Sequence, residues 1–280
     1  MTPLSYAGFL SKPWASILLG RKKKRIKQGD SVPVITANWM DIPIRPIESY
    51  LDICGFSQSK EAPWPITFPQ VLLTPLHMQI VALPAFPFPA LGLVHVRQQC
   101  HQHHPIIRPS SLRAKSWVDD LIFRRKGAEI TIYSELYEGD LLLWSASTTV
   151  FSRHPKGHGQ TENRHEIPSP TNEAQHETWH LQANLGRQYT KVSGDFNPIH
   201  LYAWSAKIFG FERAIIHGMW TIAHVISKME PCPANLSVQF IRPVMLPSEP
   251  EFIHDIYEGN QRFWINNTKQ KVCLWGMLSV

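Results

Sequence analysis

Apolar residues recur at spacings of three and four in two stretches of the chain, one from Pro65 to Leu83 and the other from Ala214 to Met229. Side chains at this spacing fall on one face of a helix, and the many apolar positions indicate that this face is buried. The residues that carry the pattern are Phe68, Val71, Leu72, Leu76 and Ile80 in the first stretch, and Ile215, Met219, Ile222, Ala223, Ile226 and Met229 in the second. The pattern therefore predicts two long buried helices.

Segments typical of β-strands follow each predicted helix. We expect strands at 93–99, 129–138 and 141–151 in the first half of the chain, and at 236–244 in the second half. Because both halves place a long helix before their strands, the order of elements favours an internal duplication.

Two short turns support this duplication. Tyr137 to Asp140 and Tyr257 to Asn260 both carry a Glu-Gly pair of the kind found in β-hairpins. Each turn precedes a segment with a tryptophan, Trp144 in the first half and Trp264 in the second.

The two halves are separated by a polar segment. Residues 152–176 are rich in His, Pro, Gly, Asn and Glu and contain few apolar residues, which predicts a mobile linker. We therefore expect an amino-terminal domain at 1–151 and a carboxy-terminal domain at 177–280.

The composition suits a soluble globular protein of one or two domains, since 43% of the 280 residues are hydrophobic and 18% are charged. The four cysteines are scattered and form no Cys-x-x-Cys pair, so free buried thiols are expected rather than a disulfide framework. These features agree with a cytoplasmic enzyme. The net charge of +6 would favour an anionic ligand, but charge alone identifies no partner.

Two segments resemble membrane or targeting elements. Residues 71–96 contain no Lys, Arg, Asp or Glu, but four prolines interrupt them, so a buried helix, a turn and a strand are expected instead of a membrane span. The basic run at 21–25 follows a mildly apolar stretch, whereas a secretory signal carries its positive charge before the apolar core. The run is typical of a solvated surface, with phosphate binding as the functional alternative.

The segment from Ser193 to His200 reads Ser-Gly-Asp-Phe-Asn-Pro-Ile-His and carries acid-base groups. Its glycine permits a tight turn and Pro198 suits the first turn of a helix, so Asp195 is expected on a loop and His200 on a helix. A carboxylate and an imidazole placed in this way can reach one water molecule and move its proton near neutral pH. The alternative is that Asp195 and Asn197 only cap the helix.

A second motif, Ile216-His217-Gly218-Met219, stands near the start of the second predicted helix. Backbone N–H groups in the first turn of a helix have no intrahelical partner and lie at the positive end of its dipole. The N–H of Gly218 can therefore bind a developing oxyanion. The alternative is that Gly218 only permits close packing.

In this order, the residues resemble the MaoC-like dehydratases, or R-specific enoyl-CoA hydratases, of the hotdog fold. The matching positions are Tyr189, Ser193 to His200, Gly210-Phe211 and His217-Gly218-Met219, within a region from about residue 175 to 280. The resemblance implies that Asp195 and His200 are the catalytic pair and that Gly218 is the oxyanion donor. It also implies substrate-binding roles for four further residues, namely Ser193, Asn197, Tyr189 and His217.

The fold that the resemblance implies is an α+β tandem hotdog, with each antiparallel sheet wrapped around a long central helix. The first half lacks Asp-x-Asn-Pro-x-His and carries Leu76-His77-Met78 where the second has His217-Gly218-Met219. We therefore expect an inactive first half that completes the fold and shapes the pocket for an acyl tail.

The activity that the resemblance implies is the reversible addition of water to trans-2-enoyl-CoA, giving (3R)-3-hydroxyacyl-CoA. Coenzyme A enters as part of the substrate, and no other cofactor, no metal and no nucleic acid is expected; a homodimer is compatible with this function. A hotdog acyl-CoA thioesterase and a non-catalytic acyl-CoA-binding module are the alternatives.

Other sites are weakly supported. Cys100 to His104 has metal-ligand residue types, but no second ligand cluster stands at a zinc-like spacing. The sequence also contains no Gly-rich dinucleotide or P-loop motif and no Gly-x-Ser-x-Gly.

Overall fold

The computed structural model describes residues 35–44, 47–57, 61–153, 167–229 and 233–279. Within these residues, ten strands form one antiparallel sheet in the order β1-β3-β4-β5-β2-β7-β10-β9-β8-β6. The strands are β1 (Ile35–Trp39), β2 (Leu93–Gln102), β3 (Arg113–Arg124), β4 (Gly127–Glu138), β5 (Leu141–Arg153), β6 (Gln175–Thr178), β7 (Asn235–Phe240), β8 (Glu251–Tyr257), β9 (Asn260–Asn266) and β10 (Val272–Ser279). The helices are α3 (Glu48–Cys54), α4 (Phe68–Ala82), α5 (Leu185–Ser193), α6 (Ala203–Ile208), α7 (Gly218–Ser227) and the short 3-10 helix η1 (Pro198–His200).

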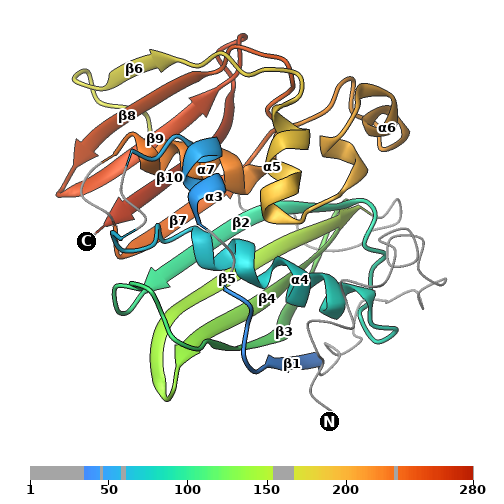
Figure 1. The fold of residues 1–280 in the computed structure, drawn as a ribbon. Helices are drawn as coiled ribbons and strands as arrows, with labels where there is room; N and C mark the ends of the chain where they lie inside the picture. Colours follow the sequence, from blue (N-terminus) through green and yellow to red (C-terminus); the bar gives the residue numbers. More distant parts are fainter. Residues whose placement is uncertain (1–34, 45–46, 58–60, 154–166, 230–232, 280) are drawn as a thin grey trace.

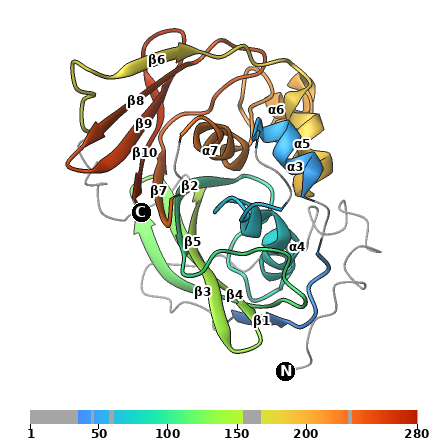
Figure 2. The same ribbon diagram turned by 60° about the vertical axis from the view of Figure 1, so that its left-hand side comes forward.

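The sheet consists of two five-stranded halves that join edge to edge. Strands β1 to β5 come from the first half of the chain and β6 to β10 from the second, and the halves meet where β2 pairs with β7. The junction extends from the Arg97–Gln239 pair to the His101–Asn235 pair. Figures 1 and 2 show each half of the sheet curving around one buried helix, α4 in the first half and α7 in the second.

The first predicted helix is confirmed as α4. Pro69 lies in its first turn, where its missing N–H costs no hydrogen bond, and Pro84 follows soon after its last residue. Leu76 and Ile80 of α4 are completely buried against the sheet.

The start of the second predicted helix was wrong. Helix α7 begins at Gly218, whereas Ala214 to His217 is extended: Ile215 forms a bridge with Met245, and the N–H of Ile216 donates to Val244. The apolar residues before Gly218 are buried on both sides of an extended segment, and their spacing only coincides with that of a helix.

Both predicted hairpins are confirmed, with the two turns joining β4 to β5 and β8 to β9. The tryptophan after each turn is buried, and its indole N–H donates to a backbone carbonyl. Trp144 donates to Ile66 at 2.8 Å, and Trp264 donates to Pro168 at 3.0 Å. The two halves therefore hold their tryptophans by the same kind of bond.

The predicted strands in the first half are present as β2, β4 and β5, whereas the predicted strand at 236–244 ends at Phe240 as β7. Strands β1, β3, β6 and β10 were not predicted. Strand β3 has the sequence Arg-Ala-Lys-Ser-Trp-Val-Asp-Asp-Leu-Ile-Phe-Arg, in which adjacent acidic residues interrupt the alternation of polar and apolar positions.

The ends of the predicted linker lie in strands, since β5 continues to Arg153 and β6 begins at Gln175. Residues 154–166 of that linker and the basic run at 21–25 are outside the described residues. The three described cysteines, Cys54, Cys100 and Cys273, are buried free thiols, as predicted. Among the helices that the structure describes, none is long and apolar enough to cross a membrane.

Because α4 fills the first half of the sheet, Ile80→Ala should lower the free energy of unfolding by about 2–5 kcal/mol. Ile80 is fully buried, whereas Ile256 in β8 is 72% exposed, so Ile256→Ala is a matched control that should change stability by less than about 0.5 kcal/mol. Urea denaturation measures both changes. Equal effects of the two substitutions would contradict the assigned core.

Candidate functional site

The predicted catalytic loop lies between α5 and η1. Helix α5 ends at Ser193 and is followed by Gly194, whose φ of 72° is the left-handed conformation that glycine adopts without strain. Asp195 follows on the loop, and its Oδ1 accepts a hydrogen bond from the N–H of Asn197 at 3.1 Å. Asn197 caps η1 through its side chain, and His200 is the last residue of η1. Asn197 therefore caps the helix, as the alternative interpretation expected. Asp195 uses only Oδ1 in this turn, and its Oδ2 takes no part in capping.

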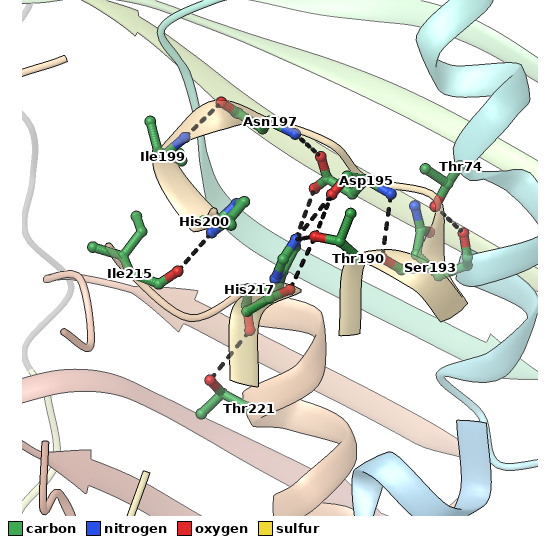
Figure 3. A network of polar contacts seen from close by, with 12 residues as sticks. Thr74, Thr190, Ser193, Asp195, Asn197, Ile199, His200, Ile215, His217 and Thr221 are labelled. Carbon is green, nitrogen blue, oxygen red and sulfur yellow. Dashed lines mark hydrogen bonds and ion pairs between the residues drawn. The ribbon is translucent and has the colours of Figure 1, made fainter. Parts of the chain in front are cut away.

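That carboxylate faces two histidines (Figure 3). The side-chain ligand atoms of Asp195, His200 and His217 all lie within 4.8 Å of one another. Asp195 Oδ2 is 4.0 Å from His217 Nε2, and the two imidazole rings stack with their centres 3.7 Å apart. The fold therefore brings together Asp195 of the loop, His200 of η1 and His217, which directly precedes α7.

The hydrogen bonds of His200 determine which of its nitrogens can react. Its Nδ1 lies 2.8 Å from the carbonyl oxygen of Ile215. A carbonyl oxygen can only accept, so Nδ1 carries the proton, and Nε2 of the neutral ring keeps a free lone pair. Burial lowers the pKa of His200, against the opposing effect of the Asp195 charge, so the ring is neutral at pH 7.

His217 is tied to the backbone of the catalytic loop. Its Nε2 donates to the carbonyl of Asp195 at 3.1 Å, and Thr190 Oγ1 lies 3.0 Å from the same carbonyl. Burial lowers the pKa of His217 to about 3, and its Nδ1 has no hydrogen-bond partner among the described residues. His217 was predicted to bind substrate; its side chain lines the cavity described below, and it also positions Asp195.

Gly186 was not singled out from the sequence, although the position of His200 depends on it. A Cβ on Gly186 would lie 2.3 Å from the carbonyl oxygen of His200, so only glycine lets α5 pack so closely against η1. Arg187 holds the next residue of the loop, since its Nη1 donates to the carbonyl of Leu201 at 2.9 Å. A glycine in the first turn of a polar helix was the only sequence signal for this contact.

Gly218 is the first residue of α7, where its N–H has no intrahelical partner. A Cβ at this position would lie 2.5 Å from Cε1 of Phe240 on β7, and the Phe240 ring in turn packs against His95 of β2 with ring centres 4.7 Å apart. Both predicted roles of Gly218, a free donor and a close contact, are therefore compatible with its position.

The remaining predicted residues also lie at the site. Ser193 is buried and its Oγ accepts from the N–H of Asp195 at 3.2 Å. Tyr189 is buried with its ring 5.1 Å from that of His217, and burial raises its pKa well above the usual value. All seven predicted site residues border one cavity of about 310 Å³.

The cavity extends from the catalytic loop into the first half of the chain. Its apolar lining there comes from α4, β2 and β5, and includes Val71, Met78, Val81, Leu93 and Val150. The first half thus shapes the pocket without contributing a second Asp-His pair.

The spacing of Asp195, His200 and His217 would also suit a divalent metal ion, although no metal was predicted there. The cluster from Cys100 to His104 forms no comparable group within the described residues. Cys100 is buried in β2, whereas His103 and His104 are exposed.

The family model described as "MaoC like domain" matches residues 161–272, a segment that includes Asp195, His200 and Gly218. The chain carries a MaoC-like domain. Over 235 residues, the chain is 29% identical to 3-hydroxyacyl-thioester dehydratase X of Mycobacterium tuberculosis, with 80% of this chain and 81% of that protein covered. It is also 29% identical over 168 residues to peroxisomal enoyl-CoA hydratase 2 of Arabidopsis thaliana, covering 54% and 53% of the two chains.

Two solved structures share the fold of most of this chain. The crystal structure of HtdX of Mycobacterium tuberculosis superposes with a TM-score of 0.75 at 26% identity, covering 88% of this chain and 99% of that one. A MaoC-like dehydratase of Phytophthora capsici, 15% identical, shares the fold with a TM-score of 0.74 over 91% and 98% of the two chains.

Because His217 is buried as a neutral ring, stability should fall in acid. An unfolded histidine has a pKa of about 6.5, so below that pH the unfolded chain binds a proton that His217 takes up only near pH 3. The free energy of unfolding, relative to that of a His217→Gln variant, should fall by up to ~1.4 kcal/mol per pH unit between about pH 6 and 4. Denaturant unfolding across this range measures the difference, which should be constant above about pH 7.5. Parallel curves throughout would contradict the buried neutral ring.

Proposed function

We propose that this protein adds water reversibly to the double bond of a trans-2-enoyl-CoA, giving (3R)-3-hydroxyacyl-CoA. The proposal depends on one observation, the position of Asp195 beside the neutral His200. Both residues line a cavity that Gly218, the first residue of α7, also lines. The names of the two relatives, a 3-hydroxyacyl-thioester dehydratase and an enoyl-CoA hydratase, support the same reaction.

In the proposed reaction, Asp195 and His200 hold one water molecule between them. The water oxygen bonds to C3 as its proton passes to this pair, and the electrons of the double bond move to the thioester oxygen. The N–H of Gly218 donates to that enolate oxygen, a contribution of about 3–4 kcal/mol for a well-placed donor. A proton from the pair then bonds to C2, so the acid-base groups return to their starting state.

The architecture supports a tandem hotdog. The units that we propose remain those expected from the sequence, at 1–151 and 177–280, and both ends of the 152–176 linker extend into strands, β5 and β6. Each five-stranded half encloses one helix, which is the arrangement expected of each hotdog. In this proposal the first unit is inactive, since it contains no Asp-x-Asn-Pro-x-His. The predicted correspondence of His77 with Gly218 was wrong, because His77 lies inside α4 whereas Gly218 is the first residue of α7.

A thioesterase would use the same cavity to direct water at the thioester carbonyl. An acyl-ACP thioesterase of Bacteroides thetaiotaomicron shares the fold, with a TM-score of 0.54 at 11% identity, 88% of this chain and 97% of that chain being covered. The two activities are separated by a saturated acyl-CoA, from which a thioesterase releases free thiol and a hydratase does not. A non-catalytic binding module would neither hydrate an enoyl-CoA nor release thiol from a saturated acyl-CoA.

The substrate partner in this proposal is an acyl-CoA, and no cofactor beyond coenzyme A itself is required by acid-base hydration. The absence of a nucleic-acid partner, the homodimer and the cytoplasmic location stay predictions.

Substitution of the acid-base pair should abolish most of the activity. Asp195→Asn and His200→Gln should each lower kcat/KM for a trans-2-enoyl-CoA by at least ~100-fold, because each removes a proton-transfer group from the water. Loss of absorbance at the conjugated bond measures hydration, and thermal unfolding checks that each variant folds. Near-normal turnover by either folded variant would contradict the mechanism, and so would a wild-type activity that a chelator removes and a divalent metal restores.

The close contact at Gly218 provides an independent test. Gly218→Ala should lower kcat at least ~10-fold, because the new methyl group meets Phe240 and displaces the first turn of α7 from the oxyanion. Adding Phe240→Leu should restore part of this loss, since it removes the ring atoms nearest to the methyl group. A double variant no more active than Gly218→Ala, after correction for Phe240→Leu alone, would show that this contact does not position the donor.

A further inference from the structure

A histidine of the first half packs against the residue that contacts the proposed oxyanion donor. His95 of β2 lines the cavity and is half-buried. Its imidazole ring lies against the ring of Phe240 in β7, with the ring centres 4.7 Å apart and the ring planes tilted by 44°. The Phe240 ring occupies the space beside Gly218, where an added Cβ would be 2.5 to 3.2 Å from three ring atoms. These three residues form a continuous contact from the first half to the start of α7.

An irregularity in β2 directs His95 toward the cavity. The pairing of β2 with β5 shifts between His95 and Arg97, and the residue between them has no partner on β5, which is the pattern of a β-bulge. Without this extra residue, His95 and Gln98 would lie on opposite faces of the sheet, because successive side chains alternate. With it, both lie on the face that is turned to the cavity. Their partners on β5 are Val150 and Thr148, which both line the cavity.

The bulge lies where the backbone pairing between the two halves ends. The described pairing of β2 with β7 ends at the Arg97–Gln239 pair, beside the bulge and one residue before Phe240. The ring of His95 therefore extends the contact between the halves beyond the last backbone pair.

The ring of His95 is held in one orientation. Its Nε2 lies 3.0 Å from the carbonyl oxygen of Arg97, which can only accept, so Nε2 carries the proton. Burial lowers the pKa of His95 to about 4, although contacts with the Arg97 carbonyl and Gln98 and the charge of a nearby carboxylate oppose this effect. The ring is therefore neutral at pH 7 and packs on Phe240 without a buried positive charge.

The rate of the proposed reaction depends on where the Gly218 N–H lies. An oxyanion donor is effective when it is about 2.7–3.1 Å from the oxygen that becomes charged. A displacement of about 1 Å can lower a rate by ~100-fold. The Phe240 ring can hold the first turn of α7 in place only if the ring is itself held, and His95 packs on that ring.

We propose that His95 is a positioning residue, which holds the Phe240 ring against Gly218 and thereby places the oxyanion donor. This proposal rests on the hydratase function proposed above. In it, the half that lacks Asp-x-Asn-Pro-x-His contributes to the chemical step and not only to the wall of the cavity. A residue that only lined the wall would affect substrate binding instead.

The kinetic test separates these two roles. His95→Ala removes the ring and should lower kcat for a trans-2-enoyl-CoA about tenfold with KM changed less than about twofold, because the lost interaction is made in the transition state. His95→Gln, which keeps an N–H for the Arg97 carbonyl but has no ring, should behave like His95→Ala. His95→Phe keeps a ring against Phe240 and should retain kcat within about threefold of the wild type. Thermal unfolding checks that each variant folds.

Two kinetic outcomes would overturn the proposal. One is a rise in KM with unchanged kcat in His95→Ala and His95→Gln, which is the result expected of a residue that only lines the cavity. The other is an equal loss of kcat in His95→Phe and His95→Ala, since the ring would then not be the part of His95 that acts.

His254→Ala is the matched control. His254 of β8 is also half-buried and packs on a phenylalanine, with its ring centre 5.0 Å from that of Phe252, but it does not line the cavity. Its substitution should leave kcat and KM within about twofold of the wild type. A His254→Ala variant that lowers kcat as much as His95→Ala would overturn the assignment to His95.

The amide signal of Gly218 tests the contact without any substrate. In protein labelled with ¹⁵N-glycine, NMR identifies this signal by its loss in Gly218→Ala. The signal should shift in His95→Ala, because a nearby aromatic ring changes the resonance of an N–H and the Phe240 ring is no longer held. Gly276 of β10 is an internal control, since a Cβ there would lie 2.5 Å from Cζ of a different ring, that of Phe263.

The NMR result also separates this proposal from the hydratase function. An unchanged Gly218 signal in His95→Ala, or equal shifts of the Gly218 and Gly276 signals, would overturn the positioning role of His95. A shifted Gly218 signal in a protein whose wild type hydrates no enoyl-CoA would support the positioning of Gly218 and overturn the hydratase function.

Discussion

The backbone carbonyl of Asp195 is the point on which the site depends. His217 donates to it from the residue before α7, and Thr190 approaches it from α5, so the loop is fixed from two elements that are separate in sequence. Hydrogen bonds to the backbone leave the Asp195 carboxylate available for substrate while restricting its position. His200 is restricted in the same way, because the Ile215 carbonyl uses its Nδ1 and leaves Nε2 for chemistry.

The two halves of the chain are linked around this point. The sheet is continuous from β2 into β7, and His95 of the first half packs on Phe240, which in turn contacts Gly218. Helix α3 of the first half also receives a hydrogen bond from α7, from the Trp220 indole to the Ile53 carbonyl at 2.8 Å. A first half without its own Asp-x-Asn-Pro-x-His thus packs, through Phe240, against Gly218, the proposed oxyanion donor, and supplies much of the cavity wall.

Local sequence was sufficient to predict the catalytic loop, because the Gly194 turn and the Pro198 helix start are set by residues within it. It was insufficient for the start of α7, where buried residues of an extended segment have the spacing of a helix. The roles of Gly186 and Thr190 depend on contacts with His200 and Asp195 that form only in the tertiary fold.

The central claim is that the Asp195-His200 pair directs water to C3 of an enoyl thioester and a proton to C2. The most direct measurement is mass spectrometry and NMR of the product formed from trans-2-enoyl-CoA in water enriched in both ¹⁸O and deuterium. The account predicts an intact thioester with ¹⁸O on C3 and one deuterium on C2, formed by the wild type and lost in Asp195→Asn. Label that appears instead in a free carboxylate, with release of coenzyme A thiol, would contradict it.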